Sequence, residues 1–120
     1  MWINFPESDF LKANPPCNRS QMRTEFMDKL QNARTISGTP YVILSAYRSL
    51  QHEYSKGRSG TSSHTKGCAV DIRFLNGGEL GLILKGLYLA GFTRIGINWK
   101  NKFVHVDDDK EQEQDWLWTY

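Results

Sequence analysis

Two segments of the chain place their apolar residues at the spacing of a helix with one buried face. This spacing predicts a first helix over residues 18–33, closed off by Gly38, and a second over residues 79–90, with Gly91 as its stop. The two apolar stripes consist of Met22, Phe26, Leu30 and Ala33, and of Leu80, Ile83, Leu84, Leu87 and Ala90. We therefore expect two amphipathic helices packed on a core.

Short runs of β-branched, aromatic and aliphatic residues predict strands between and after these helices. Residues 41–46 and 68–74 each form such a run, and residues 93–98 and 102–107 flank a tight turn, which indicates a β-hairpin. A short helical turn is expected at residues 50–54. The whole pattern predicts an α+β fold, with a small antiparallel sheet backed by the two helices.

The two ends of the chain lie outside this pattern. Residues 1–17 contain three of the four prolines and predict an extended arm outside the core, pinned to the surface by Trp2, Phe5 and Phe10. Alternating aromatic residues close the sequence at residues 116–120. We expect them to form a terminal strand docked on the body, rather than a stacking platform for substrate.

Length and composition indicate one globular domain, residues 1–120, with 39% hydrophobic and 23% charged residues. A net charge of +2 together with an acidic tail argues against a nucleic-acid partner. No apolar run approaches the roughly 20 residues of a membrane span. The first residues lack a basic region followed by an apolar one, so we expect neither a signal peptide nor a membrane partner.

Three side chains that can bind a metal ion occur in different predicted elements of the chain. His64 lies in a polar loop, Asp71 in the strand after it, and His105 in the second hairpin strand. Two imidazoles and a carboxylate leave a tetrahedral zinc ion one open position for water. Alternation puts His105 and Asp107 on one face of their strand. If the two strands are neighbours in the sheet, the ligands converge, which predicts a zinc hydrolase.

Other reactive side chains have simpler interpretations. Arg48 follows a predicted strand and can present its guanidinium to a carboxylate or an oxyanion, although a surface ion pair is the commoner role. His52 and Glu53 are expected on a solvated helix face, and residues 55–63 as a mobile loop beside the site.

Two cysteines are too few for a disulfide framework. We expect Cys17 and Cys68 to be free buried thiols. Cys68 stands between the candidate ligands, but by strand parity it points away from Asp71 and is not expected to bind the metal.

The chain contains Ser-Ala-Tyr-Arg-Ser at residues 45–49, Ser-Ser-His-Thr-Lys-Gly-Cys-Ala-Val-Asp-Ile at residues 62–72, and Gly-Ile-Asn followed by Phe-Val-His-Val-Asp at residues 103–107. With these motifs, residues 5–107 resemble the M15 family of zinc peptidases. That family includes D-Ala-D-Ala carboxypeptidases and phage endolysins that cut peptidoglycan stem peptides.

The resemblance implies a role for five residues. His64, Asp71 and His105 would bind one zinc ion (Zn²⁺) per chain. Arg48 would hold a substrate carboxylate or carbonyl and stabilise charge in the transition state. Ser62 would contact substrate or support a ligand, with a loop-capping role equally open.

One position departs from the family pattern. Many members carry an acidic base three residues before the last histidine ligand, where this chain has Lys102. Asp107 is the nearest substitute, and we assign it as the general base, with orientation of a ligand imidazole as its alternative role. Lys66, within the second motif, is expected to be a surface residue.

These expectations describe a monomeric zinc peptidase that hydrolyses peptide bonds in peptidoglycan stem peptides, as a carboxypeptidase or an endopeptidase. The alternative is a non-catalytic zinc-binding module that binds such peptides, an interpretation that Lys102 keeps open. A cell-wall enzyme without a signal peptide fits a phage product made in the host cytoplasm. A bacterial cytosolic enzyme is the other possibility.

Overall fold

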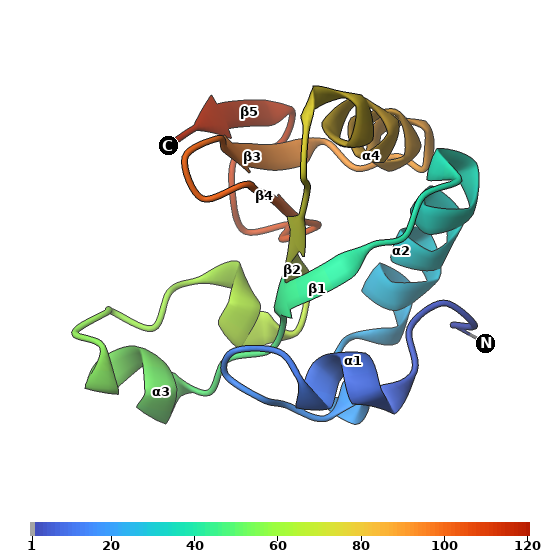
Figure 1. The fold of residues 1–120 in the computed structure, drawn as a ribbon. Helices are drawn as coiled ribbons and strands as arrows, with labels where there is room; N and C mark the ends of the chain where they lie inside the picture. Colours follow the sequence, from blue (N-terminus) through green and yellow to red (C-terminus); the bar gives the residue numbers. More distant parts are fainter. Residues whose placement is uncertain (1) are drawn as a thin grey trace.

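A mixed sheet of five strands runs through the protein in the order β1-β2-β4-β3-β5, in a computed structural model that describes residues 2–120 (Figure 1). The strands are β1 (Val42–Ser45), β2 (Ala69–Arg73), β3 (Arg94–Asn98), β4 (Phe103–Asp107) and β5 (Trp116–Thr119). The α+β class, the β3–β4 hairpin and the pairing of β2 with β4 are confirmed.

The expectation of a purely antiparallel sheet is wrong for one strand, because β5 pairs with β3 in parallel. Residues 108–115 carry the chain from the end of β4 past β3 to the edge of the sheet. The new strand therefore runs opposite to β4 and in the same direction as β3. The expected terminal strand is confirmed.

Two long helices, α2 (Thr24–Ser37) and α4 (Gly77–Leu89), lie against each other on one side of the sheet (Figure 1). The first begins later than expected, because Asn18 caps a separate 3-10 turn, η1 (Arg19–Gln21). It ends where Gly38 adopts a left-handed conformation with φ 66°. None of the helices formed by residues 2–120 is both long and apolar enough to cross a membrane.

The N-terminal segment belongs to the core, which corrects the expected surface arm. Phe5 and Phe10 are completely buried, and Phe10 lies on a short helix, α1 (Glu7–Leu11). Pro6 stands at the helix N-cap, where a missing N–H costs nothing. The N–H of Asn14 donates to Leu44 O over 2.9 Å, which ties this segment to β1.

Alternation along β2 and β4 separates core residues from site residues, as the sequence predicts. Val70, Ile72, Val104 and Val106 are completely buried in the hydrophobic core. Asp71 and His105 consequently face the other side. Figure 1 shows the third helix, α3 (Leu50–Ser55), away from α2 and α4, beyond β1.

Both cysteines are free and buried, as expected. Burial, helped by the nearby acidic side chains of Asp108 and Asp109, raises the pKa of the Cys68 thiol to about 12. This thiol packs in the hydrophobic core, apart from the three candidate ligands.

The close approach of α2 and α4 depends on Gly86, where an added Cβ would collide with Ser37 Oγ and Ala33 O. We expect Gly86→Ala to lower the free energy of unfolding by about 1–3 kcal/mol, because the helices must separate. Gly81→Ala is the matched control, because a Cβ at this position of the same helix meets no other atom within 4 Å. We expect this variant to raise the free energy of unfolding by up to about 1 kcal/mol. Urea unfolding measures both values, and equal effects would contradict this packing.

Candidate metal centre

Four strands place one residue each in a single row across the sheet. Asp71 of β2 pairs directly with His105 of β4, Ser45 of β1 pairs with Asp71, and Gly96 of β3 pairs with His105. The register of β2 and β4 therefore places the carboxylate of Asp71 beside the imidazole of His105, and both candidate ligands lie on strands.

The third candidate ligand comes from a 3-10 turn just before β2, η2 (Ser63–Lys66). The Ser62 hydroxyl accepts a hydrogen bond from the His64 N–H over 3.2 Å, so Ser62 caps this turn. Gly67 ends the turn with φ 71°, and a Cβ there would collide with Gln21 O. The turn holds His64 beside Asp71 of β2.

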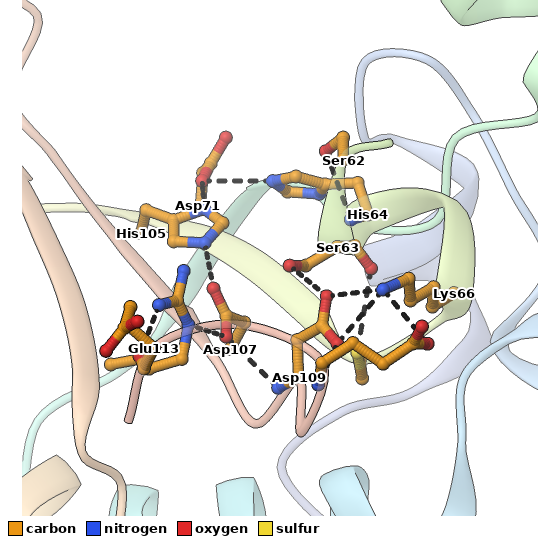
Figure 2. A network of polar contacts seen from close by, with 12 residues as sticks. Ser62, Ser63, His64, Lys66, Asp71, His105, Asp107, Asp109 and Glu113 are labelled. Carbon is orange, nitrogen blue, oxygen red and sulfur yellow. Dashed lines mark hydrogen bonds and ion pairs between the residues drawn. The ribbon is translucent and has the colours of Figure 1, made fainter. Parts of the chain in front are cut away.

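The three predicted ligands converge (Figure 2). Asp71 Oδ1 lies 3.3 Å from His64 Nε2 and 3.0 Å from His105 Nδ1. One possible ligand atom from each residue lies within 4.8 Å of the other two. A single metal ion can therefore reach all three, with imidazole and carboxylate donors that suit zinc.

The surroundings of His64 fix which of its nitrogen atoms can bind a metal. Its Nδ1–H donates to the carbonyl oxygen of Ala46 over 2.6 Å, so Nε2 carries the free electron pair. That Nε2 atom is buried and makes no hydrogen bond within residues 2–120. A buried imidazole nitrogen without a hydrogen-bond partner, aimed at a carboxylate and a second histidine, fits a metal ligand.

His105 is oriented from behind by Asp107. The Nε2–H donates to Asp107 Oδ2 over 2.7 Å, which leaves Nδ1 on the side of Asp71. Burial alone would lower the pKa of His105, but hydrogen bonds with both carboxylates outweigh it and raise the pKa to about 9. Binding of a metal at Nδ1 must therefore displace a proton.

Asp71 stays ionised, as a metal ligand must. Burial would raise the pKa of its carboxyl group, but the hydrogen bond with His105 and the nearby imidazole of His64 lower that pKa well below its usual range. The Asp71 side chain keeps 13% of its surface exposed, on the side of a cleft. Asp71 therefore joins the two histidines and is open to a ligand from solvent.

The contacts of Asp107 bear on the two roles left open for it. Its carboxylate is buried behind His105, and its Oδ1 atom accepts from Arg94 Nε over 2.7 Å and from the Asp109 N–H over 3.1 Å. It does not line the cleft beside the ligand group. This placement supports the orientation of an imidazole.

The ligand group forms part of the wall of a cleft of about 640 Å³. Arg48 extends into this cleft, with Nη2 3.6 Å from Asp71 Oδ2 and Nε donating to Ser45 Oγ over 3.1 Å. Ser62, His52 and Tyr120 also contribute to the lining. A cation thus stands beside the candidate metal ligands.

Glu53 is not on a solvated face, which corrects the expectation from sequence. Its side chain is completely buried between Arg48, at 3.4 Å, and Arg58, at 2.6 Å. Burial would raise the pKa of Glu53, but these arginines outweigh it and lower that pKa. Glu53 holds Arg48 in the cleft. His52, by contrast, is partly exposed, as expected.

Two lysines of the motif region lie outside the cleft. Lys102 places its Nζ 4.1 Å from the centre of the Trp99 ring, so its ammonium group packs on an aromatic ring. The expectation of a simple surface role is wrong for Lys66. Its side chain forms ion pairs with Asp109 at 2.9 Å and Glu111 at 3.2 Å.

Sequence reasoning missed the contribution of β5 to the site. Trp118 lies across Gly96, where any Cβ would collide with the indole ring, and its ring centre is 5.5 Å from that of His105. Tyr120 contacts Phe103 at the mouth of the cleft. The alternation of the final aromatic residues was the available signal, but only the pairing of β5 with β3 shows what they contact.

A buried imidazole–carboxylate–imidazole group beside an open cleft, in an α+β domain, is the arrangement of a metal-dependent hydrolase. The family model described as Peptidase M15 matches residues 7–107, and the chain belongs to this family of peptidases. No curated protein matches the chain. Residues 108–120, which include β5, lie beyond the family match.

Proposed function

We propose that the chain is a zinc-dependent peptidase that hydrolyses peptide bonds in peptidoglycan stem peptides, as a carboxypeptidase or an endopeptidase. Membership of the Peptidase M15 family supports the reaction class. The observation that carries the metal requirement is His64 Nε2, a buried nitrogen that has no hydrogen-bond partner among residues 2–120, beside Asp71 and His105. The stem peptide as substrate follows from the resemblance in sequence, and a phage origin stays a prediction.

His64, Asp71 and His105 would hold the zinc ion in this proposal. When bound, zinc supplies a Lewis acid that lowers the pKa of a coordinated water molecule and polarises the scissile carbonyl. The Ala46 carbonyl and the Asp107 carboxylate keep the two imidazoles in the orientation that the ion requires.

Arg48 would neutralise charge on the substrate. Its guanidinium group is fixed by Ser45 and Glu53, so little conformational entropy is lost when it binds an anion. A carboxylate at the end of a peptide, or the oxygen of the attacked carbonyl, would lie between Arg48 and the metal ligands. Ser62, which lines the same cleft, would contribute a hydrogen bond to the peptide.

Three ligands and an open cleft favour catalysis over a purely structural zinc site. Structural sites are closed by four protein ligands, whereas catalytic sites have three and leave one position for water or substrate. In residues 2–120, the grouped ligands are His64, Asp71 and His105, and Cys68 is buried in the core on the other side of β2. A purely structural zinc site would need a fourth protein ligand, and the group in residues 2–120 does not contain one.

The test is zinc content and peptidoglycan hydrolysis by the wild-type protein before and after chelation. We expect about one zinc ion per chain, together with release of new amino termini or of D-alanine that stops on chelation and returns with added zinc. The product released distinguishes an endopeptidase from a carboxypeptidase. Bound zinc without cleavage would favour the binding module, and no bound zinc would overturn the proposal.

A further inference from the structure

A second buried carboxylate lies behind the metal centre, on the segment that follows β4. Asp109 is 2% exposed and lies just beyond the family match. It accepts hydrogen bonds from Ser63 Oγ over 2.7 Å and from Lys66 Nζ over 2.9 Å (Figure 2). The N–H of Glu111 donates to it over 3.1 Å. Both of its oxygen atoms are therefore occupied.

These contacts hold the His64 turn at both ends. Ser63 and Lys66 are the first and last residues of η2, and His64 lies between them. Because Asp109 binds both, the turn is attached to the segment after β4 through one side chain. A change in the position of Asp109 would move His64 relative to β2.

The same residue is linked to the other histidine ligand. The N–H of Asp109 donates to Asp107 Oδ1 over 3.1 Å, and Asp107 Oδ2 accepts from His105 Nε2 over 2.7 Å. A continuous series of hydrogen bonds thus joins the His64 turn to His105 behind the ligand group, as Figure 2 shows. Asp109 stands at the middle of this series.

We propose that Asp109 is a positioning residue, which sets the separation of His64 from His105 and thereby raises the affinity of the site for zinc. Asp109 does not touch the ligand atoms, so it acts only through Ser63, Lys66 and Asp107. The inference rests on the proposed function to the extent that the site binds zinc.

A residue that only stabilises the fold and a residue that positions the ligands give different results when they are replaced. Loss of a residue that only stabilises the fold lowers the free energy of unfolding but leaves the metal affinity of the folded protein unchanged. Loss of a positioning residue weakens metal binding in protein that is still folded, because residues behind the ligands typically contribute about 10- to 100-fold to metal affinity. Zinc affinity and stability must therefore be measured separately.

The first variant is Asp109→Asn, which removes the negative charge that holds Lys66. The second is Ser63→Ala, which removes only the hydrogen bond from Ser63 to Asp109 and tests the inference if Asp109→Asn fails to fold. Glu111→Gln is the matched control, because Glu111 also pairs with Lys66 but is 77% exposed. Zinc affinity is measured by competition with a chelator, and ligand geometry by the absorption spectrum of the cobalt-substituted protein. Urea unfolding of the metal-free protein gives the stability.

We expect zinc affinity to fall about tenfold in Asp109→Asn and less in Ser63→Ala, with a changed cobalt spectrum, whereas Glu111→Gln stays within about twofold of wild type. Unchanged zinc affinity in folded Asp109→Asn and Ser63→Ala, with only lower stability, would overturn the inference and leave the proposed function intact. A wild-type protein that binds no zinc would overturn both.

Discussion

Replacement of His64 by alanine is expected to remove zinc from the protein and to abolish peptidase activity. The variant lacks Nε2, and within residues 2–120 the group that can hold the ion consists of His64, Asp71 and His105 alone, so two ligands remain. Loss of a residue behind a ligand already costs about 10- to 100-fold in metal affinity, so loss of the ligand itself should cost more than about 100-fold.

The matched control for this variant is His52→Ala. His52 lines the same cleft but does not belong to the ligand group, so His52→Ala should retain about one zinc ion per chain. Metal analysis after dialysis and circular dichroism of both variants separate loss of zinc from loss of fold. A folded His64→Ala protein that keeps its zinc would contradict the ligand assignment.

The ligands could be predicted from sequence because their placement depends on short-range rules. Parity along β4 puts His105 on the face opposite Val104 and Val106, and both valines are indeed in the core. The pairing of Asp71 with His105 had to be assumed, since no local pattern specifies which strands become neighbours. The expectation that Asp71 and His105 bind the same ion therefore depended on the resemblance of the motifs to the M15 family.

The errors concern residues whose partners are distant in the sequence. Lys66 looked like a surface residue because three strands and a helix separate it in the chain from Asp109, with which it pairs. Phe5 and Phe10 looked like anchors of a surface arm because prolines surround them, yet a short helix fits between those prolines. Burial of a polar or aromatic group depends on tertiary contacts that composition does not encode.

The parallel β5 was unpredictable for a related reason. An acidic segment separates it from β4, and nothing in that segment shows on which edge of the sheet the next strand will pair. Gly96 gave the one indirect signal, since a glycine inside a strand often marks the close approach of another group. In this protein that group is the indole of Trp118.

Asp107→Asn is expected to weaken zinc binding by about 10- to 100-fold, because the variant loses the negative charge that holds the His105 imidazole and pairs with Arg94. Activity should fall at limiting zinc and recover in large part when zinc is added to saturation. Titration of activity against free zinc measures this recovery. Asp108→Asn is the control, since it removes the adjacent carboxylate, whereas the ring nitrogens of His105 contact Asp107 and Asp71.

The same experiment decides between the two roles of Asp107. A general base acts on the reacting water molecule, so its loss would leave zinc affinity unchanged and activity absent at every zinc concentration. An orienting carboxylate acts through His105, so its loss changes the zinc concentration at which activity appears. Both oxygen atoms of Asp107 are already occupied by His105, Arg94 and the Asp109 N–H, away from the cleft. We therefore expect the second result.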